Sequence, residues 1–112
     1  MMIEYIKDCS YIKDKAYKND ESLSAVIISE GVKTIGKEAF ANCNSLKIVL
    51  FPESIKTIAE SAFRNSGIKI ENQCTVFLAY CIKNSAADML LGENYIKIYY
   101  NKEKGLHDDS CN

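Results

Sequence analysis

The stretch Thr34-Ile-Gly-Lys-Glu-Ala-Phe-Ala-Asn-Cys-Asn-Ser-Leu46 decides the fold of this chain, because it recurs along the sequence. Its first half returns as Thr57-Ile-Ala-Glu-Ser-Ala-Phe-Arg-Asn65, and a weaker copy of the whole precedes it over residues 11–23. Three sets of residues repeat at a step of 23 positions: Ile12, Ile35 and Ile58; Tyr17, Phe40 and Phe63; Asn19, Asn42 and Asn65. A fixed period of this size indicates a solenoid whose coils stack on one another.

Each repeat predicts a main strand, a corner and a second short extended piece. Apolar residues alternate within residues 23–28 and 46–51, which places every second side chain of these strands on the core side. Gly31 and Pro52 then suit a corner, because glycine relaxes the backbone and proline lacks a backbone donor. An Ala-Phe pair follows on a helical turn. With one ring per repeat at the same depth, the sequence predicts a stacked column of aromatic side chains.

The same alignment extends to the beginning of the chain. A step of 23 residues places Ile3-Glu-Tyr5 under Val26-Ile-Ile28, so we expect a first main strand there. Farther along the chain the spacing shortens, because Ile68 takes the place of Leu46, and the period then disappears.

The remaining residues predict a cap that closes the last coil. Residues 74–80 and 95–100 are typical of strands, and residues 85–91 of a short helix that Ser85 caps and Gly92 ends. Terminal units of a solenoid differ from the others because they cover its final open layer. The predicted single domain has these parts: repeats over about 1–22, 23–45 and 46–67, a cap over 68–100 and a polar tail over 101–112.

The composition is that of an ordinary globular domain. The 112 residues are 47% apolar and 26% charged, which excludes a disordered or fibrous chain. A net charge of −1 with scattered basic residues predicts no nucleic-acid partner. The five cysteines, an odd number at irregular spacing, favour reduced thiols. No membrane span or signal peptide is visible, so we expect a cytoplasmic protein from the sequence as given, or a cell-surface or secreted one if it is part of a longer chain.

Motifs that could carry chemistry have simpler explanations. Gly31-Val-Lys-Thr-Ile-Gly-Lys-Glu38 approaches a phosphate-binding loop, but Glu38 stands where a hydroxyl should hold magnesium, and the repeat explains both glycines. His107 and Cys111 lie four residues apart without a third orienting group. One histidine and no Cys-x-x-Cys pair provide too few metal ligands. We therefore predict no catalytic residue, no metal site and no cofactor.

The repeat pattern Leu-x-x-Val-x-Ile, followed by Val-x-x-Ile-Gly-x-x-Ala-Phe-x-x-Cys-x-x-Leu, resembles the leucine-rich repeats of the BspA type, found in many bacterial surface and secreted proteins. The resemblance covers about residues 3–100, and residues 23–46 match best. The signature positions of that repeat are Val32, Ile35, Gly36, Ala39, Phe40, Cys43 and Leu46. The resemblance implies an α/β fold, a right-handed leucine-rich-repeat solenoid of mostly parallel strands with short helical segments and a C-terminal helix-strand cap. It also implies a role in binding other macromolecules.

The side of the main strands that faces away from the core is apolar as well. Ala25 and Ile27 alternate with the core positions of one repeat, and Ile48 and Leu50 with those of the next. A strand face in contact with water normally carries polar groups instead. Two explanations stay open at this point: either the chain's own cap or tail covers this face, or the face meets a partner or a second copy of the chain.

We predict a non-catalytic protein-interaction module that binds a protein partner through its concave strand face. The predicted binding residues combine apolar area for affinity with flanking groups for orientation: Ser24, Ala25, Ile27, Lys47, Ile48 and Leu50. The alternative is a structural protein that self-associates through the exposed first strand, residues 1–6, or through the apolar strand face, since free strand edges invite pairing. No set of nucleophile, base and oxyanion donors supports an enzyme.

Overall fold

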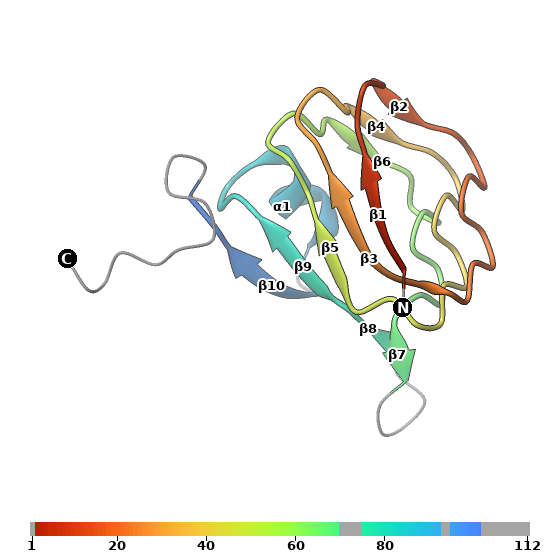
Figure 1. The fold of residues 1–112 in the computed structure, drawn as a ribbon. Coiled ribbons are helices and arrows are strands. Elements are labelled where there is room, and N and C mark those ends of the chain that lie inside the picture. Colours follow the sequence, from red (N-terminus) through yellow and green to blue (C-terminus); the bar gives the residue numbers. More distant parts are fainter. Residues whose placement is uncertain (1, 70–74, 93–94, 102–112) are drawn as a thin grey trace.

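The computed structural model describes residues 2–69, 75–92 and 95–101 (Figure 1). The elements follow in this order: β1 (Met2–Ile6), β2 (Tyr11–Ile12), β3 (Leu23–Ile28), β4 (Thr34–Ile35), β5 (Ile48–Leu50), β6 (Thr57–Ile58), β7 (Ile68–Lys69), β8 (Thr75–Val76), β9 (Leu78–Cys81), α1 (Ala86–Leu91) and β10 (Ile96–Tyr99).

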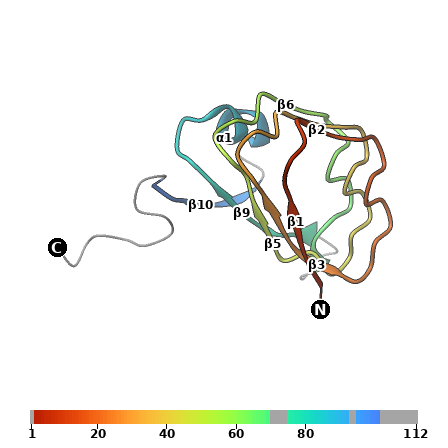
Figure 2. The ribbon, with the colours of Figure 1, turned by 45° about the horizontal axis from the view of Figure 1, so that its top comes forward.

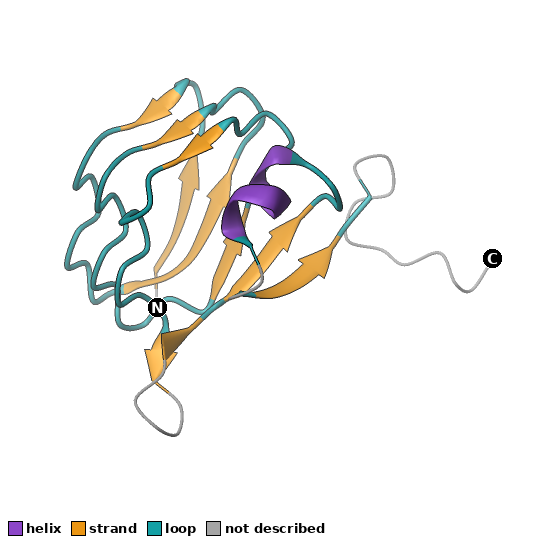
Figure 3. Cartoon of the chain, turned by 180° about the vertical axis from the view of Figure 1, so that it is seen from behind, coloured by secondary structure: helices purple, strands orange, loops and turns teal. Residues whose placement is uncertain are grey.

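The strands form two parallel sheets and one small hairpin. The main sheet has five strands in the order β1-β3-β5-β9-β10, and the second sheet has three in the order β2-β4-β6. Figure 2 shows the loops that join the sheets running side by side from coil to coil. Seen from behind, α1 lies in the layer of the second sheet, next to β6 (Figure 3). The fold is therefore the α/β leucine-rich-repeat solenoid with a helix-strand cap that the sequence predicts.

The core lies between the two sheets and is built from the periodic apolar positions. The largest side chains that are almost completely buried are Leu23, Val26, Ile28, Val32, Ile35, Phe40, Leu46, Val49, Phe51 and Ile55. Burial of one such side chain stabilises a protein by about 1.5–3 kcal/mol. The repeat thus supplies most of the apolar area that holds the coils together.

A column of aromatic rings runs through the core. Phe40 stacks on Tyr17 and on Phe63, with ring centroids 5.2 Å apart in both pairs and interplanar angles of 1° and 7°. The predicted stack of three rings is therefore confirmed. Phe77 and Tyr95 continue the column, with centroid distances of 5.1 Å from Phe63 to Phe77 and 5.2 Å from Phe77 to Tyr95. The column thus reaches from the first coil to the residue that precedes β10.

The asparagine of each repeat ends the turn that carries the ring. Asn19, Asn42 and Asn65 have φ angles of 65°, 59° and 56°, in the left-handed region that asparagine tolerates better than most residues. The Asn42 side-chain amide also donates a hydrogen bond of 2.9 Å to the Asn19 side-chain oxygen. Backbone shape and contact between coils together explain why this residue recurs.

The predicted alignment of the first strand is wrong by one residue. β1 pairs with β3 so that Glu4, not Ile3, lies opposite Val26. The register shifts at Ser24, an extra residue of β3 that forms a β-bulge. Because a shift of one residue exchanges the two faces of a strand, Ile3 and Tyr5 point away from the core and Glu4 points towards it.

The predicted strand over residues 74–80 is interrupted at Phe77. Thr75–Val76 pairs with β7, whereas Leu78–Cys81 pairs with β5 in the main sheet. The buried Phe77 side chain joins the ring column at the break between these two strands. The single predicted strand is therefore two short strands in two different sheets.

The hairpin also changes the spacing between coils. Ile48 pairs with Leu78, thirty residues later instead of 23. Ile68 lies on the hairpin and is 38% exposed, whereas Leu46 is completely buried. The prediction that Ile68 takes the place of Leu46 is therefore wrong, because this coil contains an inserted hairpin.

The predicted helix and its caps are confirmed. The Ser85 hydroxyl accepts the backbone N–H of Asp88, and the backbone N–H of Gly92 donates to the carbonyl of Asp88. The Asp88 carboxylate accepts 2.8 Å hydrogen bonds from the Lys97 ammonium and from the backbone N–H of Asn84. Lys97 first and Asn84 second hold the pKa of Asp88 below its usual value. The cap is thus fastened by one ion pair between α1 and β10.

Candidate functional site

The outer face of the main sheet carries two rows of apolar side chains. The strand register places one residue from each of the five strands in each row. The first row consists of Ile3, Ala25, Ile48, Leu78 and Ile96, and the second row of Tyr5, Ile27, Leu50, Tyr80 and Ile98. We use the term outer face for these ten residues. Every one of them is aliphatic or aromatic, and none carries a charge.

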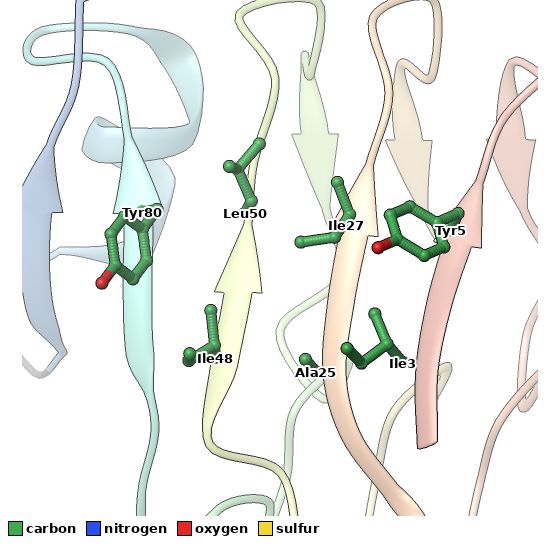
Figure 4. A pocket seen from close by; sticks show the side chains of 7 residues that line it. All are labelled: Ile3, Tyr5, Ala25, Ile27, Ile48, Leu50 and Tyr80. Carbon is green, nitrogen blue, oxygen red and sulfur yellow. The ribbon is translucent and has the colours of Figure 1, made fainter. Parts of the chain in front are cut away.

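Side chains of the first four strands surround a shallow hollow of about 250 Å³ (Figure 4). Its lining residues are Ile3, Tyr5, Ala25, Ile27, Ile48, Leu50 and Tyr80. The aliphatic side chains of β3 and β5 lie in the middle, and the rings of Tyr5 and Tyr80 stand on either side of them. The only polar side-chain atoms of this lining are the two tyrosine hydroxyls.

A second hollow of about 420 Å³ lies beside the first and shares Ile48 with it. It is lined by Lys47, Ile48, Ile68, Val76, Phe77 and Leu78, where the hairpin meets the beginnings of β5 and β9. Lys47 is its only charged lining residue. The apolar surface therefore continues from the sheet onto the hairpin.

Four of the six predicted binding residues line the first hollow together: Ala25, Ile27, Ile48 and Leu50. Ser24 is buried in the β-bulge, and its hydroxyl donates a 3.1 Å hydrogen bond to the carbonyl of Met2. Ser24 and Lys47 line a separate, more polar hollow of about 300 Å³ near the amino-terminal ends of β3 and β5. Lys47 also lines the second apolar hollow.

Sequence analysis missed the contributions of β1, β9 and β10 to the outer face. The register error placed Ile3 and Tyr5 on the core side. Leu78 and Tyr80 follow the inserted hairpin and so break the 23-residue step. The two-residue alternation of their strand is the signal that could have revealed them, together with the same alternation in residues 96–99.

The described part of the cap does not cover the outer face. β9 and β10 extend the main sheet sideways, and α1 lies on the side of the second sheet (Figure 3). The predicted polar tail, apart from residue 101, lies outside the described residues. Within the described chain, the outer face is therefore open to a partner.

Both edge strands of the main sheet carry a charged side chain towards the core. Glu4 on β1 accepts a 2.9 Å hydrogen bond from the Tyr17 hydroxyl, and Lys97 on β10 pairs with Asp88. The central strands have Val26, Val49 and Ala79 in the same row. Inward-pointing charges on edge strands oppose pairing with a further strand.

The raised pKa of Tyr17 should lower the free energy of unfolding at alkaline pH. Burial first, and the hydrogen bond to Glu4 second, raise its pKa from 10.0 to about 12. The unfolded chain therefore loses the tyrosine proton before the folded chain does, and this contribution to stability is lost as pH rises from 10 to 12. We expect the midpoint of urea unfolding to fall less steeply over this range in Tyr17→Phe than in the wild type.

The quantity to compare is the slope of the urea midpoint against pH, because Tyr17→Phe also removes a hydrogen bond and lowers stability at every pH. Tyr11→Phe, which changes an exposed tyrosine, serves as the matched control. Equal slopes for Tyr17→Phe and the wild type would contradict the assignment.

The phosphate-loop pattern has a structural explanation. Gly31 has a φ angle of 106°, and a Cβ atom at Gly36 would lie 2.7 Å from the backbone nitrogen of Asp14 in the preceding coil. Glycine is therefore needed at one position for backbone shape and at the other for close packing of coils. The predicted pair His107 and Cys111 lies outside the described residues.

The described part of the chain contains no group of three or more side chains that could hold a metal ion. Burial raises the pKa of the Cys43 and Cys81 thiols, and the Cys43 thiol donates to the carbonyl of Tyr17.

Among the helices of the described residues, none has the length and apolar character needed to span a membrane. The outer face is thus the main candidate for function in the described chain.

Comparison with known families agrees with this architecture. A family model described as a BspA type leucine rich repeat region of six copies matches residues 3–101. The protein is thus a leucine-rich-repeat solenoid, a class of protein-interaction modules. It belongs to the BspA-type leucine-rich-repeat family. Neither the curated proteins nor the solved structures contain a significant match.

Proposed function

We propose that the chain is a non-catalytic protein-binding module whose outer face binds a partner protein. The observation that carries this proposal is the apolar character of all ten outward positions on five adjacent strands. A contiguous apolar patch on the surface of a soluble protein is often functional, and patches of this kind mark interaction sites. Membership of a repeat family of interaction modules supports the same function.

The side chains at the rim suit a binding surface. Tyr5 is 64% exposed, and Tyr80 stands on the opposite side of the first hollow. Tyrosine offers a large apolar ring and one polar atom, and it is enriched among residues that dominate binding energy. The aliphatic centre would supply affinity, while the two hydroxyls would orient the partner.

Pairing through the free edge of β1, the alternative function, is less well supported by the geometry. Glu4 would have to remain next to the new strand with its charge directed inwards. Because such charges block edge-to-edge pairing, the face rather than the edge is the better candidate surface.

Insertion of a charge into the outer face should abolish binding without unfolding the chain. We expect Ile27→Asp and Leu50→Asp to weaken partner binding at least about 100-fold, because a carboxylate at the centre of an apolar interface costs several kcal/mol to bury. Both residues are only partly buried, so the fold should survive. Affinity chromatography on immobilised chain, with quantitative mass spectrometry of retained proteins, provides the measurement.

Met89→Asp is the matched control, because Met89 is an apolar residue on α1 that is 73% exposed. A partner should be retained by the wild type and by Met89→Asp, and lost from both outer-face variants. Retention of the same proteins by all four chains would refute the proposed function. Circular dichroism of each variant verifies that the fold is intact.

A further inference from the structure

We infer that the free edge of β1 is a dimerisation surface for a second copy of the chain, and that the charge of Glu4 prevents this pairing at neutral pH. The two β1 strands would pair in antiparallel orientation once Glu4 is protonated or replaced by a neutral residue. This inference goes beyond the proposed function, because it concerns an edge of the main sheet and not its outer face.

β1 has one hydrogen-bonded edge and one free edge (Figure 1). The backbone N–H of Met2 and the carbonyl of Ile6 form hydrogen bonds with residues that flank β3. Because the backbone groups of successive strand residues point to opposite edges, those of Ile3 and Tyr5 point to the free edge. In the described chain no strand pairs with that edge. A row of unpaired N–H and C=O groups of this kind can accept a further strand.

The longest antiparallel pairing of two β1 strands has its two-fold axis at Glu4. All five residues of each strand then take part. Ile3 exchanges hydrogen bonds with Tyr5 of the second copy, and Tyr5 does the same with Ile3. On the outer side this register sets an isoleucine opposite each tyrosine, a combination of aliphatic and aromatic side chains that stabilises neighbouring strands. The backbone and the outward side chains of β1 therefore favour self-pairing.

Glu4 is the residue of β1 that opposes this pairing. It would lie opposite its own copy at a non-hydrogen-bonded position, where the two Cβ atoms are only about 4.5–5.5 Å apart. Like charges directly opposite each other destabilise a strand pair. The Glu4 side chain is half-buried, so salt screens this repulsion less than it screens the repulsion between exposed groups.

The described groups around Glu4 supply no cation that could offset the repulsion. Tyr17 donates a hydrogen bond to the carboxylate, and Val26 lies beside Glu4 on β3. The other charges that act on Tyr17 belong to Cys9 and Asp20. A proton on one of the two carboxylates would remove the repulsion, because a protonated carboxyl group can donate a hydrogen bond to the other.

The other free edge of the main sheet lacks such a switch. The inward charge on β10 is that of Lys97, and the Asp88 carboxylate lies 2.8 Å from its ammonium nitrogen. The hydrogen bond from Lys97 is the first cause that holds the pKa of Asp88 below its usual value, so this ion pair persists at mildly acid pH. Protonation of one inward side chain can therefore open the edge of β1 but not that of β10.

Sedimentation of the full chain over a series of concentrations tests the inference. We expect the wild type to be a monomer at pH 7 and to form a dimer at pH 4. Glu4→Gln keeps an oxygen that can accept from Tyr17, and it should dimerise at pH 7 at least about 100-fold more tightly than the wild type. Glu60→Gln, at an exposed glutamate after β6, is the matched control and should sediment like the wild type at both pH values.

A cross-link checks the register of the pairing. Glu4→Cys removes the charge and places two thiols at positions whose Cα atoms would be about 4.5 Å apart, within the range of a disulfide. In a background in which Cys9, Cys74 and Cys111 are changed to serine, oxidised glutathione should convert this variant to a covalent dimer. Ile3→Cys in the same background is the control, because residue 3 would not lie opposite its own copy.

Several results would overturn the inference. If Glu4→Gln is a monomer at pH 7 and the wild type a monomer at pH 4, the edge does not pair. A wild type that is already a dimer at pH 7 would show that Glu4 does not prevent pairing. Cross-linking of Ile3→Cys as readily as Glu4→Cys would exclude the antiparallel register.

The proposed function is tested separately. Ile27→Asp, which should abolish partner binding, should leave the dimer of Glu4→Gln intact, because residue 27 lies on the outer face and not at the edge. Loss of that dimer in the double variant would assign it to the outer face and overturn the inference. A monomeric Glu4→Gln that still retains the partner protein would overturn the inference and leave the proposed function in place.

Discussion

Replacement of Phe40 by alanine is expected to lower the free energy of unfolding by about 3–5 kcal/mol. Phe40 is completely buried and stacks on Tyr17 on one side and on Phe63 on the other. The substitution removes the transfer free energy of the ring, leaves a cavity and breaks two stacked contacts at once. For a domain of this size, such a loss is a large fraction of the total stability.

Urea unfolding followed by circular dichroism measures this effect. Phe40→Leu keeps most of the volume and should cost less than half as much as Phe40→Ala. Tyr11→Ala is a control outside the column, because Tyr11 is 52% exposed, and it should cost less than about 1 kcal/mol. If Phe40→Ala were no more destabilising than Tyr11→Ala, the ring column would not hold the coils together.

Removal of the Lys97 ammonium is expected to cost about 3 kcal/mol at neutral pH, the lower end of the range for breaking a buried ion pair. The side chains of Lys97 and Asp88 are only 12% and 8% exposed, with 2.8 Å between the ammonium nitrogen and the carboxylate oxygen. In Lys97→Met, the Asp88 carboxylate stays in this place without its cation. The loss of a partner from such a pair is far more costly than the loss of an exposed lysine.

The free energy of unfolding of Lys97→Met should also depend less on pH in the acid range than that of the wild type. Because the pKa of Asp88 lies below the usual 3.8, the stabilising charge is present above that value and is lost as pH falls further. The difference between the wild type and Lys97→Met should therefore shrink from pH 7 to pH 2. Lys13→Met, at an exposed lysine after β2, is the control. A difference independent of pH would show that Lys97 acts through packing alone.

The ring column could be predicted because it depends on one repeated local pattern. Each aromatic residue occupies the same place in its coil, so a constant step in sequence becomes a constant step in space. Phe77 and Tyr95 could not be added in this way, since they reach the column through an inserted hairpin and through the cap. No period in the sequence links them to Phe63.

The contact between Tyr17 and Glu4 is a second feature that the repeat pattern could not predict. The first repeat looks like a degraded copy, because tyrosine replaces phenylalanine and a carboxylate stands in the core row. In the structure these two departures compensate each other through one hydrogen bond of 2.9 Å. The bulge at Ser24 that brings Glu4 to this position depends on pairing between strands, which a single repeat pattern does not encode.

Sequence analysis predicted only the part of the outer face that lies on β3 and β5, because pairing between strands sets the position of the other residues. The repeat step correctly aligned β3 with β5, where Ala25 pairs with Ile48 and Ile27 with Leu50. The bulge displaced the first strand from this alignment, and the hairpin displaced the strands of the cap. The other six residues of the outer face therefore lie on β1, β9 and β10, at the two irregular ends of the solenoid.

Methyl NMR of the isoleucine-labelled chain would locate a bound partner most directly. Three isoleucines line the first hollow of the outer face, Ile3, Ile27 and Ile48, and three of those buried in the core, Ile12, Ile35 and Ile55, serve for comparison. Titration with a peptide or protein that binds the wild type should shift or broaden the first three methyl signals and leave the other three nearly unchanged. Shifts confined to the core set, or to Ile58 of the second sheet, would contradict recognition through the outer face.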